Sequence, residues 1–351
     1  MVRGRSHDPP QVIPSRGTAA RRSRFPSPIV HGRAAAVQRA PATGACYPHL
    51  SRTLPMTMPT VTFCSPRRLP DPGSLPGRVV VLDIAFAANA GGGVSFETTT
   101  LPFIAGLGDR LAAWIDHHDH PEQARFQDDE RFILATKQQA GACPEMITTA
   151  LVERIGPVDS ILAHLDLDGL YAAAKWLRRG KPAYPEADAD SRAVDTREGE
   201  PSPLGKAVDQ ALRVKYRDES FRYRVLGFLV EGAPRSGPTW AEIKAAGDAF
   251  EELAEQTRQA ASRYKVIGRV AIVRLSPGER RIDKTYLLLL GQEIAPVAVV
   301  QQSGMITVAA PFGSGFDFPP ILGIGGGMPT RASAPQDRLE RLLEAINGKA
   351  D

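Results

Sequence analysis

The hydrophobic residues of the chain fall into short apolar runs that alternate with segments of helical character. Residues 78–83, 112–115 and 160–163 are rich in aliphatic side chains and have the length of buried strands. Residues 144–155 carry apolar positions three and four apart, and the alanine-rich residues 170–179 also predict a helix. Strands and helices in alternation predict an α/β fold with a mainly parallel, Rossmann-like sheet and right-handed crossovers.

The pattern changes in the second half of the chain. Residues 182–203 are polar and acidic, and they predict a loop. Thr239 and Glu242 have the spacing of a capping box, which predicts a helix from Trp240 to about residue 264, long enough to connect two lobes. The remaining residues predict a smaller α/β domain with a mixed sheet, built from β-rich runs at 266–275, 284–290 and 294–300 and a terminal helix at 335–346.

Composition separates the first part of the chain from the rest. Residues 1–55 contain nine Arg, no Lys and one acidic residue, without a periodic apolar pattern, and this predicts disorder. The alternatives are an organellar transit peptide and an over-extended start before Met56 or Met58, and composition favours the second. We therefore expect a disordered leader at 1–58, a larger domain at 59–235, a connecting helix at 236–264 and a smaller C-terminal domain at 265–351.

The net charge of the whole chain is opposite in sign to that of the residues beyond 55. The formal net charge is +4, but the chain beyond residue 55 has 34 basic and 38 acidic residues, a charge of −4. A mildly acidic body argues against binding of long nucleic acid, which depends on many phosphate contacts. No apolar run reaches the roughly 18–20 residues of a membrane helix. Three cysteines without CxxC spacing predict a protein of the reducing cytoplasm.

Four of the seven histidines lie in two short motifs, each of which follows an apolar run. In the second motif, ILAHLDLDG at 161–169, His164, Asp166 and Asp168 alternate with leucines. Alternate side chains of an extended segment share a face, so this spacing directs all three at one metal centre. Gly169 would then allow a tight turn into a helix. The alternative is a solvated acidic loop with an incidental histidine.

The first motif, WIDHHDH at 114–120, follows its apolar run in the same way. Neighbouring residues of an extended chain point to opposite faces, so His117 and His118 should differ in role, one binding metal and the other facing substrate. Asp116 can orient one imidazole, and Asp83, at the end of another apolar run, can bridge two ions. Mixed nitrogen and oxygen ligands favour Mn²⁺ over structural zinc. A surface cluster or a non-catalytic zinc site is the alternative.

These segments together resemble the DHH phosphoesterases. The resemblance covers most of residues 78–330 and rests on VLDIAF around Asp83, IDHH at 115–118, AGACPEMI at 140–147 and HLDLDG at 164–169. In addition, LGIGGGMP at 322–329 resembles the glycine-rich loop of the smaller domain of that family. The resemblance implies a catalytic domain that binds two Mn²⁺ ions and a smaller domain that binds substrate.

The chain departs from the family pattern at two points. The family usually places its His-Asp-Asp element first, whereas here it follows the Asp-His-His element, an order that a circular permutation would reconcile. Met328 stands where the family loop often has histidine, which affects the expected substrate contacts more than the metal ligands.

The resemblance also implies roles for individual residues. His118 would contact or protonate the phosphate, and His117 would act beside it as a ligand of the second ion. For the last ligand, Asp195, which precedes a threonine, fits better than Asp190. The implied metal ligands are Asp83, His117, His164, Asp166, Asp168 and Asp195.

The glycine-rich loop supplies candidate substrate contacts. Gly325, Gly326 and Gly327 could present backbone N–H groups to a phosphate, with Arg331 as a fork-like partner. A structural turn is an equal alternative for this loop.

We therefore predict a manganese-dependent phosphoesterase that cleaves a phosphodiester or phosphoanhydride bond by a two-metal mechanism. Short oligonucleotides or other phosphorylated, nucleotide-derived molecules are the expected substrates, and Mg²⁺ or Co²⁺ could replace Mn²⁺. One alternative is a catalytically silent regulator of the same fold that binds nucleotide or metal. Another is an HD-type phosphohydrolase, whose ligands lie on helices; the strand-like runs before both motifs disfavour it.

Overall fold

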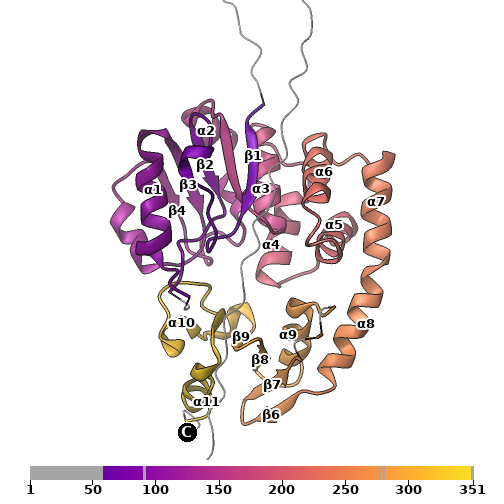
Figure 1. Cartoon of the computed structure of the whole chain (residues 1–351). Helices are drawn as coiled ribbons and strands as arrows, with labels where there is room; N and C mark the ends of the chain where they lie inside the picture. The colour runs from indigo at the N-terminus through magenta and orange to yellow at the C-terminus, as the bar shows by residue number, and fades with distance from the viewer. Residues whose placement is uncertain (1–57, 90–91, 277, 280, 349–351) are drawn as a thin grey trace, which may run out of the picture. The chain divides into compact units, whose positions relative to one another are not determined.

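The structure is a computed structural model that describes residues 58–348 except 90–91, 277 and 280 (Figure 1). The predicted disordered leader therefore lies, apart from Met58, outside the described residues. Among the described residues, no helix is both long enough and apolar enough to cross a membrane.

The first of two sheets is entirely parallel. Its strands follow the order β1-β5-β2-β3-β4, so the chain visits them out of sequence through crossover connections. All four residues of β2, at the centre, are fully buried, as a parallel sheet covered on both faces requires. The strands are β1 (Thr60–Cys64), β2 (Val79–Leu82), β3 (Leu111–Asp116), β4 (Phe132–Leu134) and β5 (Ser160–His164).

Helices on both faces of this sheet create two hydrophobic cores. Val80 and Leu82 of β2 pack into one core, and Val79 and Val81 pack into the other, following the two-residue alternation of a strand. The first core contains the buried face of α3, and the second contains α1. The helices of this region are α1 (Leu101–Leu107), α2 (Thr149–Ile155), α3 (Leu167–Leu177), α4 (Ala187–Thr196), α5 (Pro203–Val214) and α6 (Glu219–Val230).

Two predictions for this region are wrong in detail. The predicted loop at 182–203 contains α4, whose Asp188 and Asp190 lie in the first turn, where negative charge favours a helix. The predicted helix at 144–155 is a short 3-10 turn followed by α2. Thr148 causes the break, because its side chain caps α2 by accepting a hydrogen bond from the Leu151 N–H.

The predicted connecting helix consists of two helices. These are α7 (Gly237–Asp248) and α8 (Phe250–Ala261), which are interrupted at Ala249. The predicted capping box does not form, because α7 begins upstream of Thr239, with Pro238 in its first turn.

The second sheet is mixed, with the strand order β10-β9-β8-β7-β6. Only β7 and β8 pair in parallel, and the other pairs are antiparallel. This arrangement and the parallel first sheet confirm the predicted fold class. The elements are β6 (Lys265–Ile267), β7 (Val270–Arg274), α9 (Lys284–Gln292), β8 (Val297–Gln302), β9 (Met305–Ala309), α10 (Phe318–Leu322), β10 (Arg331–Pro335) and α11 (Leu339–Asn347).

The predicted strand at 284–290 is instead the helix α9. Asp283 caps this helix by accepting a hydrogen bond from the Tyr286 N–H, and Leu287 and Leu288 bury its apolar side. Parallel strands cannot be joined by a tight turn, so the β7–β8 connection needs a crossover of this kind. The terminal helix, predicted from residue 335, begins at Leu339.

Candidate metal centre

The carboxyl ends of three neighbouring strands bring imidazole and carboxylate groups to one edge of the parallel sheet. Asp83 follows β2, His117 and His118 follow β3, and His164 ends β5. Because β3, β2 and β5 are adjacent, these side chains converge. In the part of the chain that the structure describes, three groups have donor atoms within 4.8 Å of one another and could hold a metal ion: Asp83–His117–His118, Asp83–His164–Asp166 and His117–Asp168–Asp195.

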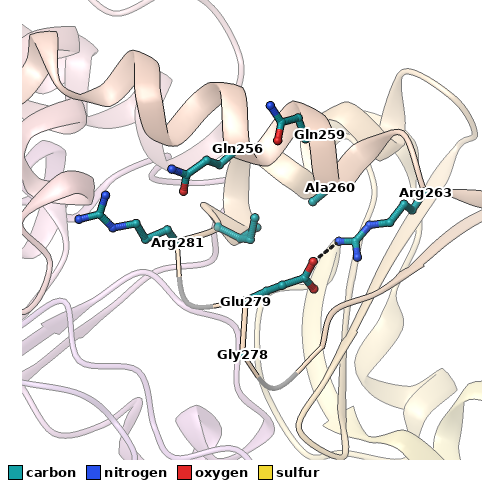
Figure 2. A pocket seen from close by; sticks show the side chains of 8 residues that line it. Gln256, Gln259, Ala260, Arg263, Gly278, Glu279 and Arg281 are labelled. Carbon is teal, nitrogen blue, oxygen red and sulfur yellow. Dashed lines mark ion pairs between the residues drawn. The ribbon is translucent and has the colours of Figure 1, made fainter.

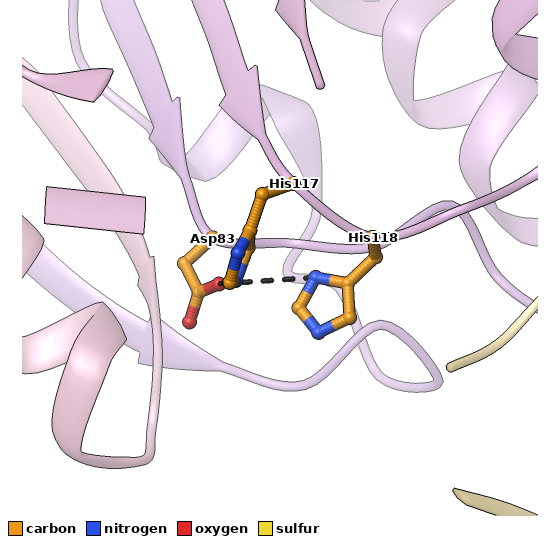
Figure 3. Close-up of side chains that lie close together, drawn as sticks. All are labelled: Asp83, His117 and His118. Carbon is orange, nitrogen blue, oxygen red and sulfur yellow. Dashed lines mark ion pairs between the residues drawn. The ribbon is translucent and has the colours of Figure 1, made fainter. Parts of the chain in front are cut away.

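Asp83 lies close to the imidazoles of His117 and His118, on the side of His117 (Figure 3). It is fully buried, and its φ of 59° places it in the left-handed region. Its Oδ1 lies 3.2 Å from His117 Nε2 and 3.8 Å from His118 Nδ1, while its Oδ2 lies 3.5 Å from His164 Nδ1. Within the described residues, neither oxygen accepts a well-aligned hydrogen bond. A buried carboxylate with two free acceptor oxygens is suited to bind a cation.

Burial and like charge act together on this carboxylate. Burial, with the negative charges of Asp168 and Asp166, raises the pKa of Asp83 to about 6, although His117 and His164 act in the opposite direction. The ionised form is thus costly in the metal-free protein, and a nearby cation would relieve that cost.

His117 has one nitrogen engaged outside the centre and one directed into it. Its Nδ1 lies 2.8 Å from the Ala140 carbonyl oxygen, to which it donates. Its Nε2 lies 3.2 Å from both Asp83 Oδ1 and Asp168 Oδ2, and 3.7 Å from Asp195 Oδ2. Burial acts to lower the pKa of His117, but the first two carboxylates outweigh it and raise the pKa to about 11. An imidazole fixed through a backbone carbonyl is typical of metal ligands.

The second motif is arranged differently from the prediction. Only His164 belongs to a strand; Asp166 is the N-cap of α3, and Asp168 lies in its first turn. His164 Nδ1 lies 2.8 Å from Asp166 Oδ2, whereas Asp168 points toward His117. The three residues therefore do not share one face of an extended segment. Gly169 lies inside the helix, where a Cβ would come within 2.5 Å of the His164 carbonyl oxygen.

Asp116 orients His118. The Asp116 carboxylate is fully buried, and its Oδ1 lies 2.8 Å from His118 Nδ1. The other ring nitrogen, Nε2, is not engaged by Asp116, and the imidazole is partly exposed. Burial acts to raise the pKa of Asp116, but the His118 imidazole outweighs it and lowers the pKa. The two histidines do not point to opposite faces, because β3 ends at Asp116: both rings approach Asp83, with their centroids 4.8 Å apart.

Lys137 is a member of the centre that no sequence motif predicts. Its side chain is 2% exposed, its Nζ lies 3.0 Å from His117 Nε2, and it forms an ion pair with Asp195. No spacing around Lys137 distinguishes it from a surface lysine. Its burial results from tertiary packing, so no local pattern could have revealed it.

The two candidates for the last ligand have different surroundings. Asp195, on α4, belongs to the group with His117 and Asp168. Asp190 instead accepts hydrogen bonds from the backbone N–H and the hydroxyl of Ser202, and from the Tyr184 hydroxyl. Asp190 therefore stabilises the start of α5 and lies outside the three groups.

The glycine-rich loop contacts the segments beside the centre. The Asn89 N–H donates to the Gly325 carbonyl oxygen over 3.1 Å, and the Gly327 N–H donates to the Asp119 carbonyl oxygen over 3.3 Å. The Gly327 amide is therefore already engaged by protein, which limits the number of amides that this loop can offer to a phosphate.

Arg331 lies at the start of β10, in the second sheet. One guanidinium nitrogen donates to the Thr285 hydroxyl over 3.0 Å, and the charges of Asp195 and Asp166 act on the group. Burial, together with the positive charge of Arg213, nevertheless lowers the pKa of Arg331.

Gly326→Ala should destabilise the contact between the loop and the segment after β3. Gly326 has a φ of 78°, and a Cβ there would lie 2.0 Å from His120 Cδ2. Left-handed strain and overpacking together should lower the free energy of unfolding by about 2–4 kcal/mol, measured by urea denaturation. Gly325→Ala is the matched control, because its Cβ would meet no atom within 4 Å. Equal stability of the two variants would contradict the prediction.

A separate cavity of about 450 Å³ lies beside α8 (Figure 2). Gln256, Gln259 and the ion pair between Arg263 and Glu279, 2.7 Å long, contribute to its lining. None of the candidate metal ligands lines this cavity, so it is not part of the centre.

Comparison with known proteins gives little further information. No known protein family matches the chain, and no curated protein matches it. Three chains of solved structures match it, among them the pGpG-specific phosphodiesterase PggH from Vibrio cholerae. That match has a TM-score of 0.38 and 10% sequence identity, and it covers 78% of this chain and 98% of the other. A likeness at this level has no bearing on the activity of the present chain.

Proposed function

We propose that this protein is a metal-dependent phosphoesterase that hydrolyses a phosphodiester or phosphoanhydride bond in a short oligonucleotide or a nucleotide-derived molecule. The main support is Asp83, a buried carboxylate that faces three imidazoles and accepts no well-aligned hydrogen bond within the described residues. The motifs that resemble the DHH phosphoesterases supply the same residues, and this agreement favours phosphate chemistry over a purely structural site.

The donor set fits a divalent transition metal. The three groups offer imidazole nitrogens and carboxylate oxygens and no thiolate, a combination that suits Mn²⁺, with Mg²⁺ or Co²⁺ as substitutes. Besides the two Asp83 oxygens, His164 Nδ1 is buried and, although 2.8 Å from Asp166 Oδ2, makes no well-aligned hydrogen bond among the described residues. Buried polar atoms without partners are costly unless a ligand binds them, so their concentration here favours a cation site.

The residues of the centre would have different roles in the proposed reaction. A divalent cation bound here would lower the pKa of a water molecule and neutralise phosphate oxygens. Asp83 and His164 would hold the cation, together with Asp166. His118, held at Nδ1 by Asp116, would present Nε2 to the phosphate and donate a proton to the leaving oxygen. Arg331 would bind a second phosphate oxygen or a terminal phosphate.

Hydrolysis of a 5′-phosphorylated dinucleotide in Mn²⁺ tests the proposal. The wild type should release mononucleotides, and EDTA should abolish the release until Mn²⁺ is restored. Asp166→Ala should lower the rate by more than about 100-fold, because even residues that only orient metal ligands cost 10–100-fold when removed. Asp128→Ala, at an exposed position, is the control that should keep full activity. Hydrolysis that persists in EDTA, or in the Asp166 variant, would contradict the proposal.

A further inference from the structure

The donor atoms of one of the three groups converge on a positive charge that the protein itself supplies. His117 Nε2, Asp168 Oδ2 and Asp195 Oδ2 lie close together, and the ammonium of Lys137 sits among them. Lys137 Nζ is 3.0 Å from His117 Nε2 and is ion-paired with Asp195. With 2% of its side chain exposed, Lys137 is held inside the centre and does not reach in from solvent.

Buried ammonium groups need compensating partners, because removing a lone charge from water is very costly. Burial acts to lower the pKa of the Lys137 ammonium, but the negative charges of Asp195, Asp168 and Asp83 outweigh it and raise the pKa. Two of these three, Asp195 and Asp168, belong to the group His117–Asp168–Asp195. The lysine and a metal ion would therefore use the same donor atoms.

A divalent ion cannot share this position with the ammonium. A metal bound through imidazole lies about 2.0–2.1 Å from the nitrogen, the distance seen for zinc. An ion at that distance from His117 Nε2 would lie no more than about 5 Å from Lys137 Nζ, given the 3.0 Å between the two nitrogens. Like charges this close inside a protein repel strongly, so occupation by one disfavours the other.

The group of Asp83, His164 and Asp166 has a different composition. It contains an imidazole and two carboxylates, and His164 Nδ1 lies 2.8 Å from Asp166 Oδ2 and 3.5 Å from Asp83 Oδ2. Both Asp83 oxygens and His164 Nδ1 make no well-aligned hydrogen bond among the described residues, and the same holds for Asp195 Oδ2 in the other group. The two groups thus differ in that only His117–Asp168–Asp195 lies around a lysine ammonium.

We propose that the Lys137 ammonium replaces one of the two metal ions that the sequence predicts, so that the wild type binds a single divalent ion at Asp83, His164 and Asp166. This inference rests on the metal centre of the proposed function but does not require that the protein hydrolyse any substrate. It follows that removal of the ammonium should open a second cation site at His117, Asp168 and Asp195.

The test is the number of Mn²⁺ ions bound per chain in the full-length wild type and in Lys137→Met, measured by equilibrium dialysis with elemental analysis. Methionine keeps much of the length and loses the charge. The wild type should bind one ion and give the EPR spectrum of isolated Mn²⁺. The variant should bind two and give an exchange-coupled spectrum.

Lys175→Met is the matched control. Lys175 is also buried, with 6% exposure, and it contacts Asp188 and the Pro144 carbonyl oxygen outside the centre. This variant should bind one ion, like the wild type. Lys137→Arg, which keeps the charge, should also bind one.

The possible outcomes distinguish a failure of this inference from a failure of the proposed function. Two ions in the wild type would overturn the inference even if the Lys137 variant does not fold, and one ion in a folded Lys137→Met would also overturn it. No bound ion in any variant would overturn the inference and the proposed metal centre together. One ion in the wild type and two in the variant, without hydrolysis, would support the inference and contradict only the proposed activity.

Discussion

Asp83→Asn should abolish metal binding and lower kcat/KM by more than about 100-fold, yet it should stabilise the metal-free protein. Asp83 belongs to two of the three potential ligand groups found among the described residues, whereas each of the other carboxylates in these groups belongs to one. Asparagine keeps the shape of the side chain and tolerates the positive φ of this position better than most residues. A loss of function with a gain in stability is not expected of a residue with a merely structural role.

The stability gain should depend on pH in a defined direction. The pKa of Asp83 is raised from 3.8 to about 6, so the folded metal-free protein binds this proton more tightly than the unfolded chain does. The contribution of Asp83 to stability is therefore fully present below about pH 4 and is lost as the pH rises through about 6. Asparagine does not ionise, so the variant should be the more stable protein at pH 7 and no more stable at pH 4.

Thermal unfolding of the two metal-free proteins across this pH range measures the effect. The melting temperature should rise by about 2–4 °C for each kcal/mol recovered, the scale for a unit of 150–250 residues. Asp116→Asn is the opposing control, because the pKa of Asp116 is lowered and its removal should destabilise the protein at pH 7. If Asp83→Asn lowered the melting temperature at pH 7, the repulsion around Asp83 would not be what limits stability.

The sequence identifies the centre because its main residues follow apolar strands. Asp83, His117 and His164 each stand at or just after the end of a run of buried aliphatic residues. In a parallel sheet those ends share one edge, so a local pattern is enough to predict that the residues meet. The glycine-rich loop also contacts segments beside the centre, although the engagement of Gly327 by Asp119 depends on a contact between distant segments.

Other features depend on contacts that a local pattern does not contain. The four consecutive leucines of α9 fit a buried strand as well as a buried helix, and only the parallel pairing of β7 with β8 decides between them. The alternation of His164, Asp166 and Asp168 predicts one shared face only while the strand continues. Because Asp166 caps α3, Asp168 turns toward His117. Lys137 enters the centre through packing alone.

His118→Gln should lower kcat by about 10²–10⁴-fold, the usual contribution of a general acid or base, while the number of bound metal ions stays unchanged. His118 is more exposed than His117, and its Nδ1 is engaged by Asp116, which leaves Nε2 for the substrate. Steady-state kinetics on the dinucleotide, together with metal analysis of the same samples, measures both quantities. A variant that loses metal, or changes only KM, would show that His118 is a ligand or a binding residue.

Asp116→Asn should cause a smaller loss of kcat, about 10–100-fold, because Asp116 acts only by orienting His118. The double variant Asp116→Asn/His118→Gln distinguishes this orienting role from an independent contribution of Asp116. If Asp116 acts through the imidazole, removing both groups should cost no more than His118→Gln alone, since the carboxylate then has nothing to orient. If the kcat losses of the two single variants multiply in the double variant, Asp116 contributes its own negative charge to the centre. In that case, pairing with His118 would not explain why the Asp116 carboxylate is completely buried.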